Sequence, residues 1–155
     1  MNKMNKFLKA SIFALCTLGM SATSFAAERG TIDEAITLVQ KAKVYIKANG
    51  SEKAYAAFSD PKGQFIDRDL YIFVFDKKGN TLAHGGNQRL IGKNLYELKD
   101  VTGLYSTQAL LDAAQKGGGK SHFKFLNPKT KAIESKTGYS EMAGDVMIGS
   151  GAYVK

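Results

Sequence analysis

Cysteine and histidine are scarce in this sequence, and each shortage excludes a class of chemistry. The 155 residues include one cysteine, Cys16, and two histidines, His84 and His122. A single cysteine allows no intramolecular disulfide, so the fold depends on packing. Neither histidine has carboxylates nearby in the sequence at the spacing of metal ligands, and we expect no metal site. No catalytic motif is evident, so we expect neither an enzyme nor a cofactor.

Long runs of one charge are also missing, since the longest is the pair Lys77-Lys78. The formal net charge is +8; if the three lysines before residue 10 are removed, 19 basic residues stand against 14 acidic ones and the charge is +5. This mild, scattered excess gives no basic stripe of the kind that binds nucleic acid. We expect no nucleic-acid partner.

The N-terminal segment has the three parts of a secretory signal peptide. Three lysines precede a short apolar run at residues 12–20, and Ser-Phe-Ala at 24–26 places small residues where a signal peptidase reads. The run is too short for a stable membrane span. We expect cleavage after Ala26, an exported domain at 27–155, and a periplasmic or secreted protein without a lipid anchor on Cys16.

The first half of the exported chain carries two helical patterns. Residues 31–49 place apolar side chains three and four positions apart, which predicts a helix with one apolar stripe. Thr31 is the expected N-cap, and Asn49-Gly50 ends the helix. Ser51 starts a second, short helix that ends before the break at 59–63.

The remaining segments predict an antiparallel sheet interrupted by one helix. Residues 70–75 are all aromatic, β-branched or leucine, which is typical of a strand covered on both faces. A turn with Gly79 leads back into a strand at 81–84. A long connection and a helix at 104–116 follow. Three hairpin-linked strands are then expected at 121–126, 132–142 and 146–154. The order predicts one α+β domain with a five-stranded antiparallel sheet.

Three stretches of the chain resemble a known family. The segment YIFVFDKKGNTLAHGGNQRLIGKNLYELKDVTGLY is similar to the core, and SKTGY and MIGSGAYV to the ending, of single Cache domains of the second subtype. The resemblance spans roughly residues 31–155. It implies a PAS-like extracytoplasmic sensor fold, in which a long N-terminal helix packs on a sheet whose concave face holds a small ligand. Because such modules usually sit in receptors, it also implies a membrane receptor or kinase as the partner of this exported chain.

The family pattern and the residue chemistry together nominate a ligand site. A carboxylate in a partly dry cavity needs charge-assisted hydrogen bonds, which lysine or histidine can donate. An apolar wall with few polar groups is typical of small-molecule sites. The predicted ligand-binding residues are Tyr71, Phe73, His84, Lys93, Asp100, Lys136 and Tyr139.

Each polar candidate also has a structural interpretation. His84 can serve to hydrogen-bond a neighbouring polar group, and Lys136 can face solvent. Asp100 is either a cap that shapes its loop or a counter-charge that orients a lysine. The segment 81–95 is expected to leave the sheet at His84 and arch over the concave face. Its glycines, which replace prolines common in the family, would let the backbone approach a ligand while Lys93 and Lys136 point inward.

Two functional hypotheses remain open at this stage. The first is an exported sensor-type module that binds a small organic acid and acts with a membrane partner. The alternative keeps the fold without a working pocket and pairs in a homodimer through the helix at 31–49. An enzyme without a recognised motif is a third, weaker interpretation.

Overall fold

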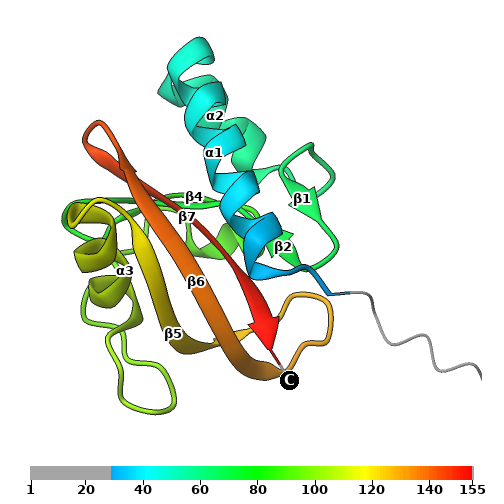
Figure 1. Ribbon diagram of the computed structural model, residues 1–155, viewed down its shortest axis with the longest axis vertical. Helices are drawn as coiled ribbons and strands as arrows, with labels where there is room; N and C mark the ends of the chain where they lie inside the picture. The colour runs from blue at the N-terminus through cyan, green and yellow to red at the C-terminus, as the bar shows by residue number, and fades with distance from the viewer. Residues whose placement is uncertain (1–28, 155) are drawn as a thin grey trace, which may run out of the picture.

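The computed structural model describes residues 29–154, so the predicted signal peptide and its cleavage site lie outside the described residues. Within them the predicted α+β architecture is confirmed (Figure 1). Two helices come first, a sheet follows, and a third helix interrupts the strand order. No helix in the described part of the chain combines the length and apolar character needed to cross a membrane.

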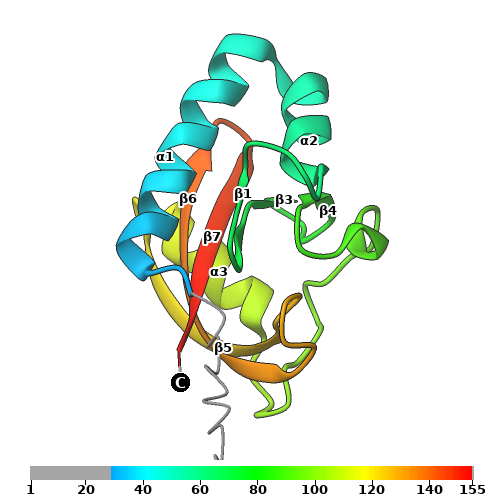
Figure 2. The same cartoon turned by 90° about the vertical axis from the view of Figure 1, so that its right-hand side faces the viewer.

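The N-terminal helix α1 (Ile32–Asn49) begins where the sequence predicts. The Thr31 hydroxyl accepts from the backbone N–H of Glu34, and the Glu34 carboxylate accepts from that of Thr31 at 2.7 Å. This reciprocal capping box satisfies two otherwise unpaired donors. Gly50 ends the helix at φ 79°, and α2 (Ser51–Ser59) starts directly after it. The two helices meet at a sharp bend (Figure 2).

The main sheet has the five antiparallel strands that were predicted, and their order is β4-β3-β7-β6-β5. Its strands are β3 (Phe73–Asp76), β4 (Thr81–His84), β5 (Gly119–Leu126), β6 (Ile133–Ala143) and β7 (Val146–Val154). Helix α3 (Ser106–Gln115) connects β4 to β5. The last strand, β7, therefore pairs between β3 and β6 and joins the early hairpin to the late one.

Two features were not predicted, a two-stranded ribbon and a short 3₁₀ helix. The expected strand at 70–75 is split, and its first part, β2 (Leu70–Tyr71), pairs with β1 (Ile66–Asp67) to form the ribbon. The turn between them holds Arg68 at φ 57°. A short 3₁₀ helix, η1 (Gln88–Leu90), lies in the long connection after β4. Elements of two or three residues are too short to produce a periodic signal in a sequence.

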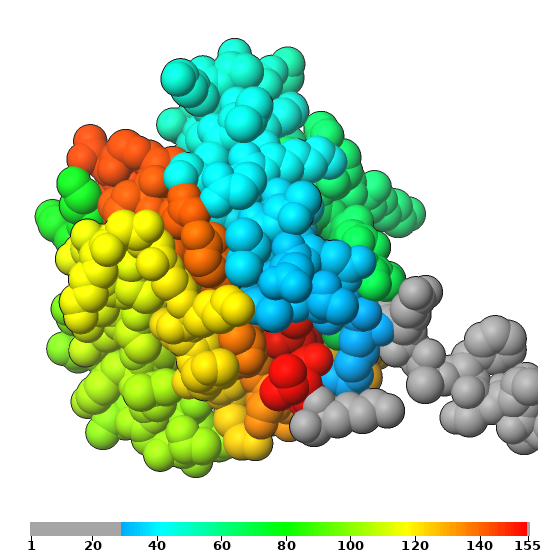
Figure 3. Space-filling model, in the orientation of Figure 1, coloured from blue at the N-terminus to red at the C-terminus, as the bar shows by residue number. Residues whose placement is uncertain are grey.

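The two faces of the main sheet bury different sets of side chains. Helix α1 covers one face and packs with aliphatic residues of the strands, such as Val74, Ile148 and Ala152. In Figure 3, α1 in blue and cyan covers the middle of this face, while the chain around β5, in yellow, lies uncovered beside it. We call this the α1 face. The opposite face packs against α3 and the long connection, and Met147 and Tyr153 project from it. We call it the pocket face.

Candidate functional site

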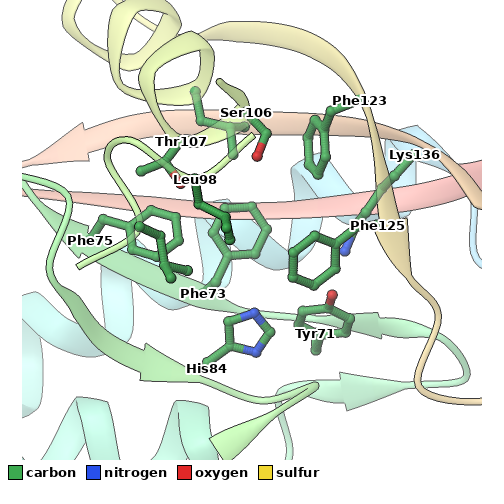
Figure 4. Close-up of a pocket in the computed structure, with 12 residues that line it drawn as sticks. Tyr71, Phe73, Phe75, His84, Leu98, Ser106, Thr107, Phe123, Phe125 and Lys136 are labelled. Carbon is green, nitrogen blue, oxygen red and sulfur yellow. The ribbon is translucent and has the colours of Figure 1, made fainter. Parts of the chain in front are cut away.

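A small cavity lies on the pocket face (Figure 4). It has a volume of about 20 Å³, enough for roughly one water molecule. Strands β2 to β6 supply seven of its twelve lining residues, and α3 and the connection before it supply the other five. The lining residues are Tyr71, Phe73, Phe75, His84, Leu95, Leu98, Ser106, Thr107, Leu110, Phe123, Phe125 and Lys136.

Lys136 enters this cavity from the middle of β6. In the sheet it is paired with Phe123 on one side and Tyr153 on the other. Its side chain is 2% exposed, and Nζ lies 3.9 Å from the ring centroid of Tyr71 and 4.6 Å from that of Tyr153. Two further rings, those of Phe73 and Phe125, lie within 6 Å of Nζ. Among the described residues, no hydrogen bond or ion pair engages this Nζ.

The surroundings of Lys136 act on its charge in opposite directions. Burial lowers the pKa of the ammonium to about 7, because the charged form loses its hydration, and the Asp69 carboxylate opposes this fall. The four aromatic faces also favour the cation. Asp69 is itself buried, and within the described residues its Oδ2 has no hydrogen-bond partner.

His84 ends β4 beside Lys136 and is a neutral donor. The backbone N–H of Asn87 donates to its Nδ1 at 2.9 Å. A neutral ring that accepts at Nδ1 carries its hydrogen on Nε2. Burial and, to a smaller extent, the nearby charge of Lys136 lower the pKa of the imidazole to about 3. The ring lies 5.1 Å from that of Tyr71, so His84 forms part of the aromatic wall as well.

A pair of hydrogen-bonded tyrosines lies against Nζ of Lys136. The hydroxyl oxygens of Tyr71 and Tyr153 are 3.0 Å apart, and the Tyr153 hydroxyl donates to the carbonyl of Leu126 at 2.8 Å. Since Tyr153 has one hydrogen to give, the Tyr71 hydroxyl donates to Tyr153. Burial raises the pKa of both phenols, so both stay neutral.

The structure brings four of the seven predicted site residues together at the cavity. They are Tyr71, Phe73, His84 and Lys136. The interpretation of Lys136 as a solvent-facing residue is excluded by its burial. His84 combines its structural and its ligand-binding interpretation. Its Nδ1 accepts from the backbone N–H of Asn87 in the loop, and its Nε2 is left for a ligand in the cavity.

Asp100 has the structural role that was one of its two interpretations. Its Oδ1 accepts from the backbone N–H groups of Thr102 and Leu104, and its Oδ2 accepts from that of Lys124 at 2.8 Å. Burial pushes the pKa of Asp100 upward, but these hydrogen bonds outweigh it and bring the pKa down to about 2. The carboxylate thus fastens the connection to β5 and does not line the cavity.

After His84, the segment 81–95 reaches the cavity only at its last residue, Leu95, and it does not turn Lys93 inward as expected. Lys93 is exposed, and its carbonyl accepts from the backbone N–H of Thr81 along the edge of β4. The glycines serve the protein interior, because a Cβ on Gly86 would lie 2.6 Å from the Tyr71 ring. The cover comes later in the connection, from Leu95 and Leu98.

Tyr139 lies on the opposite side of the sheet from Lys136. Side chains alternate across a strand, so residues three apart face opposite ways. Tyr139 packs with the core of the α1 face, and its hydroxyl donates to Glu141. Glu141 in turn pairs with Lys43 of α1. The structure therefore places Tyr139 in a link between sheet and helix.

Several cavity residues had not been singled out as site residues. Phe123 and Phe125 alternate along β5 toward the pocket face, and this spacing was a usable signal. Tyr153, the second-last residue of the MIGSGAYV motif, is not part of the cavity wall but lies beside Lys136, and its shared face with Met147 was a usable signal. Ser106 and Thr107 begin α3, and nothing in the sequence marks their hydroxyls as cavity groups. No group of three or more His, Cys, Asp or Glu in residues 29–154 is placed to hold a metal ion.

Comparison with protein families gives one match over most of the chain. The model of the family Single Cache domain 2 matches residues 18–155. Sensor histidine kinase MctS from Rhizobium johnstonii is 30% identical over 89 residues. This match covers 56% of the chain but 19% of the kinase, so the chain corresponds to about a fifth of that protein.

Two solved structures share the fold over most of their length. A methyl-accepting chemotaxis protein from Vibrio parahaemolyticus is 32% identical with a TM-score of 0.71, covering 79% of this chain and 88% of that one. A Cache chemosensory domain, solved for its recognition of carboxylic acid, is 21% identical with a TM-score of 0.67, covering 79% and 92%. At 21% identity the second likeness shows the fold alone.

Proposed function

Because the chain belongs to the Single Cache domain 2 family of extracytoplasmic sensor domains, we propose that its pocket face binds a small organic acid. The observation that carries the proposal is the Lys136 ammonium, which is 2% exposed and forms no ion pair or hydrogen bond within residues 29–154. A buried cation without a partner is costly, and an anion that reaches it restores a charge-assisted contact.

The groups around Lys136 suit a carboxylate on a short apolar body. His84 offers Nε2–H, and the hydroxyls of Ser106 and Thr107 line the same cavity. The rest of the wall is aromatic or aliphatic, which favours an apolar tail and provides no second cation for a second carboxylate. A cavity of about 20 Å³ restricts the ligand to the smallest acids and requires the side chain of Leu98, 51% exposed on the outer wall, to move aside.

A thermal-shift screen with short-chain monocarboxylates tests this function. A ligand present at a hundred times its dissociation constant should raise the free energy of unfolding by about 2.7 kcal/mol. The shift should vanish in Lys136→Met and persist in Lys129→Ala, whose lysine is exposed in a turn. A Lys136→Met protein that binds the acid as tightly as the parent would exclude Lys136 as the ligand contact.

We further propose that the chain acts with a membrane receptor or a kinase. The support is that the similar proteins are named as a chemotaxis protein and a sensor kinase. Co-purification from the native envelope, with and without the acid that the screen identifies, tests this partner. Loss of the association in Lys136→Met would connect the partner to the pocket.

One observation favours the alternative of a ligand-free dimerisation module. Val44 on the outer side of α1 is 70% exposed, although it is a large apolar residue on a helix that otherwise buries such groups. If α1 pairs with a second copy, Val44→Glu should convert a dimer to a monomer in sedimentation analysis. A parent protein that is already monomeric excludes this alternative.

A further inference from the structure

Lys136 differs from the other lysines of the described chain. It is the one lysine among the buried residues of this part of the protein. The ammonium groups of Lys43 and Lys77 pair with carboxylates, and that of Lys41 donates to a backbone carbonyl at 2.9 Å. Nζ of Lys136 meets aromatic faces instead.

Such an environment leaves part of the lysine population as a neutral amine. An amine in an apolar pocket, without an acceptor or carboxylate beside it, keeps its lone pair free, and desolvated lysines of this kind are nucleophiles toward carbonyl carbons. Among the described residues, three titratable groups that face Lys136 are neutral, namely Tyr71 on β2, His84 on β4 and Tyr153 on β7. Asp69 is the group that acts on Lys136 as a charge, in the form of a carboxylate.

We propose that the Lys136 amine forms a reversible imine with a small 2-oxo acid that enters the cavity. The inference rests on the proposed function, because the same pocket must admit the ligand. It narrows the ligand class from small acids in general to those that also carry a carbonyl group. His84 Nε2–H and the α3 hydroxyls would hold the carboxylate of such a ligand, leaving its carbonyl carbon toward Nζ.

The reaction balances without an oxidant or reductant. The Nζ lone pair adds to the carbonyl carbon, and a proton moves from nitrogen to the oxygen to give a carbinolamine. The carbon–oxygen bond then breaks, the hydroxyl takes the remaining proton of the nitrogen and leaves as water, and a carbon–nitrogen double bond forms. The Tyr71 hydroxyl, on the ring that Nζ overlies, is a group able to relay the proton between nitrogen and oxygen, and its hydrogen-bond partner is Tyr153.

The shape of the cavity supports the imine over its hydrolysis. Imines revert by addition of water, and a site that excludes water protects a reactive intermediate. Lys136 is 2% exposed, and four aromatic rings surround Nζ. An imine formed there should therefore persist longer than one formed on an exposed lysine.

Reductive trapping of the exported protein tests the proposal. The protein is incubated near neutral pH with pyruvate or glyoxylate and sodium cyanoborohydride, which reduces an imine to a stable amine, and the adduct is located by peptide mass mapping. Lactate, which has the carboxylate but no ketone, is the matched control. We expect adduct on Lys136 to exceed that on exposed Lys129 by at least about tenfold, because an ordinary exposed lysine is almost entirely protonated at this pH. Lactate should give none.

Two variants and one binding measurement separate the outcomes. Lys136→Met should lose the adduct, and Lys136→Arg should lose it while keeping a cation for lactate; if neither variant folds, mapping of the parent protein decides. Calorimetry that detects binding of lactate and pyruvate without any adduct on Lys136 overturns the imine and leaves the proposed function standing. Adduct spread evenly over exposed lysines also overturns it. Absence of both binding and adduct overturns the imine and the acid-binding function together.

Discussion

The α1 face and the pocket face share the strands β3, β6 and β7 but differ in what those strands bury. On the α1 face, Val39, Ala42 and Phe58 meet aliphatic strand residues, and the charged side chains lie around the edge in pairs such as Lys43–Glu141. On the pocket face, aromatic rings surround a lysine and a histidine that are almost fully buried.

The α1 face therefore stabilises the fold, whereas the pocket face contains a buried group that destabilises it. Every large group buried on the α1 face gains from its removal from water. Lys136 loses hydration and gains no ion pair, so its burial opposes folding. Violations of folding rules of this kind are expected at functional sites, and here one is confined to a single face.

The largest expected effect is a loss of stability from a substitution on the α1 face. Phe58 is 0% exposed and its ring lies 4.6 Å from that of Phe65, edge to face. Phe58→Ala should lower the free energy of unfolding by about 3–5 kcal/mol through lost burial and a cavity. Urea denaturation measures the loss. A loss below about 1 kcal/mol would mean that this cluster is not the main source of stability.

The second prediction is a gain of stability from a substitution on the pocket face. Lys136→Met replaces a buried cation by an apolar side chain of similar length, and the free energy of unfolding should rise by about 1–4 kcal/mol. The same denaturation series, run beside Phe58→Ala, tests the contrast. If Lys136→Met lowers the stability, Lys136 is a structural cation held by the rings around it.

The pH dependence of stability sharpens this contrast. The folded pKa of Lys136 is lowered to about 7 from the ordinary value of 10.5, so between these values the unfolded chain binds more protons than the folded one. Stability should therefore rise with pH across this window, by about 1.4 kcal/mol per unit at most, and be flat below it for this group. Denaturation of the parent between about pH 7 and pH 9 should show the rise, and Lys136→Met should lack it. An equal rise in both proteins assigns it to another group.

Much of the fold could be predicted because its signals are local and repeated. The stripe of α1, the cap at Thr31 and the apolar run after Asp69 each follow from side-chain periodicity or backbone chemistry within one segment. The break at Ile72 could not be predicted, since the run 70–75 is uniformly apolar and carries no mark of where β2 ends and β3 begins.

The site was predicted in part, and its residues show why. Lys136 and His84 came from the family resemblance, and their burial followed only from the pairing of β6 with β5 and β7. Asp100 and Lys93 are near the site in sequence, but the path of a nonrepetitive connection is set by contacts such as Asp100 with the backbone of Lys124, which no local pattern encodes. Strand alternation alone could have shown that Lys136 and Tyr139, three residues apart, do not both face the pocket.

The smallest effect is expected from paired tyrosine substitutions, one on each face. Tyr139→Phe keeps the ring and removes the hydroxyl that donates to Glu141, so it should lower the free energy of unfolding by about 0.5–1.5 kcal/mol. Because Tyr139 faces α1, acid binding should stay within twofold of the parent.

Tyr71→Phe removes a hydroxyl from the cluster beside Nζ of Lys136 and leaves Tyr153 without its donor. Loss of about one hydrogen bond there should weaken acid binding about fivefold. Calorimetric titration of both variants measures the affinities, and equal changes would mean that the pocket face does not hold the ligand.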